Sequence, residues 1–286
     1  MRIHFCGVRG STPAPGRAFL RYGGHTSSLA VAHDDSPPTL IVDAGTGLRN
    51  VSNLLSGGPY RGTILLSHLH WDHVHGLPFF QAGQQEGHRV DVRLPSPDDD
   101  ALATLARGLS PPHFPVTPTE LGTGWTFERL EVGTYVVEGF EVTVREIPHK
   151  GGQTFGFRIS DDDATVAYLG DHWPLARGPG PDGLGERHRA ALELAAGADV
   201  LVHDAQFLAK QFPDVSYLGH ASVEYAIALA IEAGARRVVL FHHAPERTDD
   251  EIDAIVTGRA TSAVPIRAAA EGDVICLRNG TVTSGR

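Results

Sequence analysis

The sequence has very few cysteines: only Cys6 and Cys276 occur among its 286 residues. Two cysteines cannot build a disulfide-rich scaffold, and they do not make a cysteine-based zinc site. Both lie in apolar runs that resemble strands, so we expect two unpaired core thiols, as is usual in an intracellular protein.

The sequence also lacks a long apolar run. No stretch approaches the roughly 20 apolar residues that a membrane-spanning helix needs. The first residues, MRIHFCGVRG, indicate a strand rather than the core of a signal peptide. We therefore expect a cytoplasmic protein with no membrane partner.

Positive charge is scarce as well. The chain has 24 Lys and Arg against 34 Asp and Glu, a formal net charge of −10. Such an acidic chain is a poor non-specific binder of nucleic acid, although a local basic patch is not excluded. Histidine, in contrast, is abundant: there are 16, and several follow predicted strands.

The pattern of apolar residues predicts alternating strands and helices without a linker or a repeat. We therefore expect one α/β domain over residues 1–286. Predicted strands include 2–8, 39–45, 63–68, 90–96, 140–149, 199–205 and 236–243. Predicted helices cover 47–55, a segment opening near His75, 98–109, 187–197, 222–234 and 248–260.

One short stretch, LLSHLHWDHVHG at residues 65–76, contains four histidines and an aspartate that could bind metal. His68 and His70 are two residues apart after a strand, so both rings lie on the same side of an extended chain. Asp72 and His73 follow where the chain turns into a helix, which can aim them at a second metal ion. Imidazole and carboxylate suit zinc, with manganese or iron as alternatives. Further candidates end other strands: Asp43, His149, Asp171, and either His242 or His243.

The HLHWDH motif with these later residues resembles the metallo-β-lactamase superfamily along essentially the whole chain. The resemblance implies a four-layer αβ/βα sandwich with two Zn²⁺ ions (Mn²⁺ or Fe²⁺ as alternatives) in a cleft at its edge. It assigns His68, His70 and His149 to one ion, Asp72, His73 and His242 to the other, and Asp171 as the bridge. Asp43 would brace the ligand loops rather than bind metal.

Two further motifs, HDAQF (203–207) and GHAS (219–222), resemble the branch of transfer-RNA 3′-processing enzymes and phosphodiesterases. In that branch an acidic residue orients a histidine that contacts the phosphate or protonates the leaving group. Asp204 and His220 would take these roles, and with Asp72 they form the candidate catalytic set. The alternative is that Asp204 only ends a strand and His220 only precedes a helix.

The chain departs from the RNA-processing enzymes at one place. Only 21 residues separate His149 from Asp171, which leaves no room for their RNA-gripping arm. We therefore expect a small-molecule substrate, a small or cyclic phosphodiester hydrolysed through a metal-bridging hydroxide, rather than a large RNA. The alternative is an acyl hydrolase that uses the same metals on a lactone, thioester or β-lactam. A purely metal-binding or redox iron protein is disfavoured, and a homodimer is allowed by analogy only.

Side chains near these motifs are weaker candidates. Arg9, His25 and Lys150 can either line the cleft and contact an anionic substrate or be structural. Trp71, inside the metal motif, is expected to pack beneath it. His75 and His172 are expected to line the cleft or to support the ligands.

Overall fold

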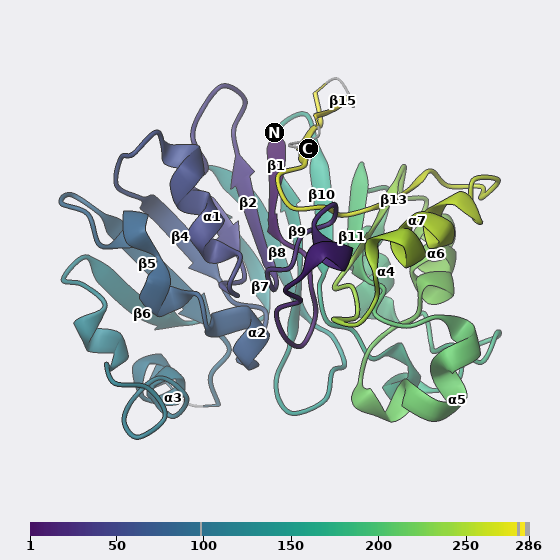
Figure 1. Ribbon diagram of the computed structural model, residues 1–286, viewed down its shortest axis with the longest axis horizontal. Helices are drawn as coiled ribbons and strands as arrows, with labels where there is room; N and C mark the ends of the chain where they lie inside the picture. The colour runs from purple at the N-terminus through teal and green to yellow at the C-terminus, as the bar shows by residue number, and fades with distance from the viewer. Residues whose placement is uncertain (98, 279–280, 284–286) are drawn as a thin grey trace.

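Two β-sheets lie face to face at the centre of this computed structural model, which describes residues 1–97, 99–278 and 281–283 (Figure 1). The first has the order β15-β14-β1-β2-β3-β4-β5-β6 and the second β13-β12-β11-β10-β9-β8-β7. The first-sheet strands are β1 (Arg2–Gly7), β2 (Ser28–Ala32), β3 (Leu40–Val42), β4 (Arg61–Leu65), β5 (Arg89–Leu94), β6 (Trp125–Arg129), β14 (Val274–Cys276) and β15 (Thr281–Thr283). The second-sheet strands are β7 (Gly133–Val137), β8 (Phe140–Glu146), β9 (Phe155–Ser160), β10 (Thr165–Leu169), β11 (Val200–Asp204), β12 (Val238–Phe241) and β13 (Ile266–Ala268).

Helices cover the outer faces of both sheets, so that the structure has four layers (Figure 1). One apolar cluster fills the space between the sheets, a second lies under the helices of the first sheet, and a third under those of the second. The helices are α1 (Leu48–Val51), α2 (Trp71–Val74), α3 (Ala101–Ala106), α4 (Arg189–Ala195), α5 (Phe212–Val215), α6 (Val223–Glu232) and α7 (Asp249–Thr257). None of these helices has the length and apolarity that crossing a bilayer requires.

Parallel pairing explains where the polar residues gather. Strands β3 to β6 pair in parallel, as do β10 to β13. The carboxyl ends of parallel strands meet at one edge, where loops can converge on a common point. β3 is followed by Asp43, β4 by His68, β10 by Asp171 and β12 by His242, while β11 ends at Asp204.

Several elements differ from the sequence prediction. Strands β6 and β7 were not predicted; each lies at the edge of its sheet with most side chains at least partly exposed, so the apolar pattern is weak. α2 begins at Trp71 rather than near His75. The predicted helix 98–109 is shorter, with Asp100 as its N-cap; residue 98 lies outside the described residues. Both cysteines are unpaired.

The loop after β1 is held by buried charge. Arg9 is fully buried and donates hydrogen bonds to the carbonyl oxygens of Gly23 and Arg247, both at 2.7 Å. It is therefore a structural residue and not part of a cleft. Glu271 accepts a hydrogen bond from the backbone N–H of His25 below the same loop. Burial raises the pKa of Glu271 to about 7, although this hydrogen bond and Arg9 oppose the shift.

We predict that Glu271→Gln stabilises the protein at alkaline pH. The folded-state pKa lies above the unfolded value, so unfolding releases a proton between about pH 4.5 and 7 and stability falls as the pH rises. The variant has no charge to bury, so its melting temperature should exceed the wild-type value by a few degrees at pH 8 and match it at pH 4. Thermal unfolding measured across this range tests the sign; an equal shift at both pH values would contradict it.

Candidate metal centre

Seven side chains from both sheets converge at the edge where the parallel strands end. Their potential ligand atoms form two groups, each lying within 4.8 Å of one another. The first group is His68, His70, His149 and Asp171, and the second is Asp72, His73, Asp171 and His242. The structure thus brings together every residue that the sequence proposed as a ligand.

The spacing of these atoms fits metal coordination. A tetrahedral zinc ion with ligands at about 2.0–2.1 Å separates them by roughly 3.3 Å. In the first group, Asp171 Oδ2 lies 3.4 Å from His149 Nε2 and 3.6 Å from His68 Nε2, and His149 Nε2 lies 3.3 Å from His70 Nδ1. In the second, Asp72 Oδ2 and Asp171 Oδ1 lie 3.0–3.4 Å from the Nε2 atoms of His73 and His242, and these two Nε2 atoms are 3.4 Å apart.

Asp171 belongs to both groups through different oxygens. Oδ1 faces His73 and His242, each at 3.0 Å, whereas Oδ2 faces His68 and His149. A carboxylate placed in this way can bridge two cations, one for each oxygen.

Contacts at Nδ1, the ring nitrogen that faces away from the cluster, orient several of the histidines. His73 Nδ1 faces Asp43 Oδ2 at 2.8 Å, His149 Nδ1 faces Gly219 O at 2.7 Å, and His242 Nδ1 faces Gln206 Oε1 at 2.9 Å. Each of these oxygens only accepts, so Nδ1 carries the proton and Nε2 presents its lone pair to the cluster. His68 follows the same pattern through Ser67 Oγ, which itself donates to Asp43. Each group therefore presents two imidazole lone pairs of this kind to the position of a metal ion.

Two buried atoms of the cluster have no hydrogen-bond partner among the described residues: His68 Nε2 and Asp171 Oδ1. Leaving such atoms buried without a partner costs free energy, and a bound cation would satisfy both. Burial holds the pKa of His68 well below its usual value and that of His149 at about 4, so both rings are neutral.

The buried carboxylates of the second group stabilise positive charge on the groups around them. Burial alone would raise the pKa of Asp171, but His242 and His73 outweigh it and hold that pKa well below its usual range. The same carboxylate, acting against burial, raises the pKa of His242 to about 10. A divalent cation can supply this positive charge in place of the proton, so the donor set of imidazoles and buried carboxylates fits metal ions such as zinc.

Asp43 braces the centre through four hydrogen bonds. It accepts from Ser67 N at 2.7 Å, Ser67 Oγ at 2.9 Å, His73 Nδ1 at 2.8 Å and Tyr168 Oη at 2.6 Å. Asp43 and His242 both have positive φ angles, 61° and 56°, which non-glycine residues adopt only where the surroundings enforce them.

The structure distinguishes His242 from its neighbour. His242 points into the cluster, whereas His243 points away and bonds Ala269 O through Nε2 at 3.0 Å. Gly10 allows the approach of His242, because a Cβ at this position would lie 2.3 Å from His242 Nδ1. Gln206, which was not predicted, orients His242; its place in HDAQF was the available signal.

Asp204 and His220 lie beside the two groups. Asp204 Oδ2 is 3.0 Å from His220 Nδ1, and the carboxylate also accepts from the backbone N–H groups of His172, Gln206 and Ala221. The His220 ring lines a cavity of about 350 Å³ together with Asp72, Asp171 and Trp71. His220 Nε2 makes no hydrogen bond to a described residue, so it is available to a molecule in that cavity.

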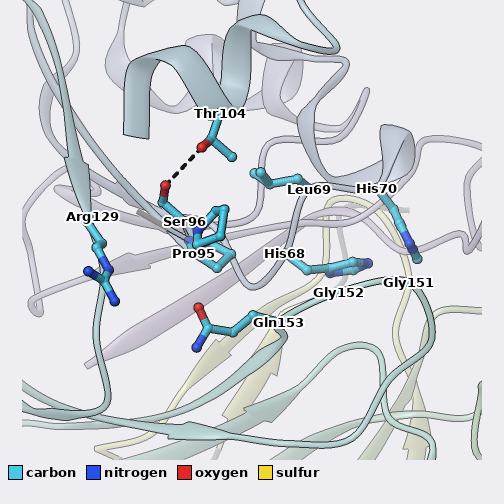
Figure 2. Close-up of a pocket in the computed structure, with 11 residues that line it drawn as sticks. His68, Leu69, His70, Pro95, Ser96, Thr104, Arg129, Gly151, Gly152 and Gln153 are labelled. Atoms are coloured by element: carbon cyan, nitrogen blue, oxygen red, sulfur yellow. Dashed lines mark hydrogen bonds between the residues drawn. The ribbon is translucent and has the colours of Figure 1, made fainter. Parts of the chain in front are cut away.

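A second cavity, of about 480 Å³, is lined by His68, Leu69 and His70 (Figure 2). Figure 2 shows Gln153 and Arg129 around it, with Ser96 hydrogen-bonded to Thr104 at 2.9 Å. Leu69 and His70 line both cavities, so the two spaces adjoin each other at the cluster.

Other expected cleft residues lie elsewhere. Trp71 does not pack beneath the motif: its side chain is 69% exposed because α2 begins here and turns it outward. Lys150 contacts Tyr217 and lines neither of these two cavities.

His172 is buried against His203 and His188 rather than in the cluster. Tyr168 and Ser67, which support Asp43, had no sequence signal beyond their place on strands.

Asp43→Asn should weaken metal binding about 10–100-fold, because an amide cannot accept all four hydrogen bonds that orient His73 and Ser67. Tyr168→Phe is the matched control, since it removes one of these bonds and should have a smaller effect. Zinc affinity measured by competition with a chromogenic chelator tests this. Equal affinities for wild type and Asp43→Asn would show that Asp43 does not support the centre.

Comparison with known proteins gives consistent matches. The family model described as "Beta-lactamase superfamily domain" matches residues 39–243. The Ribonuclease Z of Lacticaseibacillus casei (strain BL23) is 28% identical over 290 residues, covering 85% of this chain and 84% of the relative. The Ribonuclease Z of Bacillus cereus (strain B4264) is 26% identical over 288 residues, covering 85% and 88%.

Solved structures with the same fold include the metallo-beta-lactamase fold protein YhfI from Bacillus subtilis. Its TM-score is 0.69 at 20% identity, with 96% of this chain and 98% of that chain covered. A diphosphatase from the PhnP family has a TM-score of 0.67 at 16% identity, covering 96% and 97%. The short form of human tRNase Z has 0.63 at 19%, covering 97% and 99%.

These structural matches confirm the four-layer sandwich, and the family model covers most of the chain. The protein therefore belongs to the β-lactamase superfamily and is a hydrolase with the metallo-β-lactamase fold.

Proposed function

We propose that this protein is a dinuclear zinc-dependent phosphodiesterase that acts, as a single domain, on a small or cyclic phosphodiester. The observation that carries the proposal is the Asp204–His220 pair, whose histidine lines one cavity with Asp72 and Asp171 of the metal cluster. An acyl hydrolase would have no phosphate for this histidine to meet. The proposed ligands are His68, His70 and His149 for one ion and Asp72, His73 and His242 for the other, with Asp171 between them.

Two bound metal ions would supply Lewis-acid charge and make a water nucleophile available near neutral pH. The protein's own groups would do the rest. His220 Nε2, facing the cavity, would contact a phosphate oxygen and give a proton to the leaving oxygen. Asp204 would hold the ring through Nδ1, and the three backbone N–H groups around Asp204 would keep its carboxylate in place.

A large RNA is a less suitable substrate. The segment between His149 and Asp171 contains only the β9–β10 hairpin with its short connections, and no arm projects from it. Two relatives are nevertheless named Ribonuclease Z, so RNA belongs among the substrates to be tested.

His220→Ala should lower kcat for an activated phosphodiester by about 10²–10⁴ while the zinc content stays at the wild-type level. His220→Gln should behave like His220→Ala, because glutamine can donate a hydrogen bond but cannot transfer a proton. Asp204→Asn should change the pH profile of kcat and have little effect on KM. Loss of metal in the His220 variants would show instead that His220 is a ligand.

Metal analysis separates the candidate ligands from their neighbours. The wild type should bind two zinc ions per chain, and chelation should abolish hydrolysis of bis(4-nitrophenyl) phosphate. His242→Ala should lower the stoichiometry towards one, whereas His243→Gln, which can still bond Ala269 O, should keep two. Assays with a lactone, a thioester and a β-lactam complete the test. Faster chelator-sensitive turnover of these acyl substrates would overturn the phosphodiesterase proposal.

A further inference from the structure

An exposed aromatic stack adjoins the metal cluster. Trp71, 69% exposed, packs against His75 with ring centroids 5.5 Å apart and an angle of 19° between the planes. Trp71 lines the cavity that contains Asp72, Asp171 and His220. His75 lines a different groove, of about 1070 Å³. The stack therefore stands between the metal cluster and this groove.

The groove differs in charge from the rest of the chain. Although the net charge is −10, none of the described residues that line the groove is acidic. Arg49 is exposed in it and makes no hydrogen bond or ion pair with a described residue. Amide side chains from Asn53 and Gln81 and an imidazole from His113 are also exposed there.

The groove also offers aromatic surface. Phe79 is 61% exposed and meets Phe114 edge to face, with centroids 5.9 Å apart and planes at 86°. Exposed aromatic rings beside an unpaired cation and several amides are the features that bind single-stranded nucleic acid: bases stack on rings and phosphates meet cations. The volume is at the top of the roughly 300–1,000 Å³ usual for small-ligand sites, so it has room for more than one ring system.

We propose that this groove is a nucleotide subsite and that the substrate is a short single-stranded oligonucleotide. The base next to the scissile phosphate stacks on Trp71, and the following nucleotide lies in the groove with its phosphate near Arg49. This proposal rests on the proposed phosphodiesterase function and narrows its substrate class. It requires no arm, because Trp71 lines the cavity at the cluster and its stacking partner His75 lines the groove.

Hydrolysis rates for substrates of increasing length test the proposal. Methyl 4-nitrophenyl phosphate serves as the short reference, compared with oligonucleotides of two, three and five residues. We expect kcat/KM to increase with length and then level off. Trp71→Leu should lower kcat/KM for the trinucleotide about tenfold without loss of zinc, as expected for one stacked base. Arg49→Gln should lower it for the trinucleotide and leave the reference substrate unchanged.

Binding provides a readout independent of catalysis. A fluorescein-labelled trinucleotide with phosphorothioate linkages should bind the zinc-loaded wild type, as measured by anisotropy, and bind both variants more weakly. Arg236→Gln is the matched control: Arg236 is equally a surface arginine but pairs with Asp199 and does not line the groove. It should bind like the wild type.

The outcomes separate the two proposals. If methyl 4-nitrophenyl phosphate is hydrolysed but length and the Trp71 and Arg49 variants have no effect, the nucleotide subsite is wrong and the phosphodiesterase proposal stands. If no phosphodiester is hydrolysed, the phosphodiesterase proposal fails; trinucleotide binding that depends on Arg49 would then still support the groove, and its absence would overturn it.

Discussion

The buried carboxylate of Asp171 is the interaction on which the centre depends. It is almost fully buried, and its two oxygens face two different pairs of imidazoles. A charged group in such a place is tolerated only when opposite charge surrounds it. The histidines alone can supply that charge by taking up protons, but a proton on Nε2 would occupy the lone pair that each Nδ1 contact has turned towards the cluster. Divalent cations satisfy both requirements together.

The two sheets must hold a fixed relation for this arrangement to exist. The first sheet carries Asp43 and the HLHWDH motif, and the second carries Asp171, Asp204 and His242. Tyr168 joins them directly, since it stands on β10 and donates to Asp43 after β3. Beneath this contact, Phe241 and Tyr168 belong to the apolar cluster between the sheets. Packing between the sheets therefore fixes the distances among the ligand atoms, and the positive φ angles of Asp43 and His242 show that the backbone accepts strain at the same place.

That the candidate ligands lie together could be predicted from sequence because they follow strands, whose ends converge by topology. HLHWDH, Asp171 and one of two adjacent histidines required only this pattern and the family resemblance. The choice between His242 and His243 depends on a single backbone angle, and the supporting roles of Gln206, Ser67 and Tyr168 depend on contacts between distant segments. No local pattern specifies such contacts. Trp71 was misjudged because the start of α2 shifted by about one turn, which changes the direction of every side chain on it.

The arrangement of the two cavities and the groove near the cluster limits which substrates the enzyme can bind. The cavity with Gln153 and Arg129 is lined by His68 and His70, and the cavity with His220 by His70, Asp72 and Asp171. The groove is lined by His75, which stacks on Trp71. A phosphodiester differs from a phosphate monoester in carrying an ester group on each of two oxygens of its reacting phosphorus. A site with a cavity at the cluster, a second cavity adjoining it and aromatic rings nearby has room for both groups. Since the net negative charge of the chain repels polyanions in general, the absence of carboxylates among the described residues that line the groove is the feature that would admit a nucleotide there.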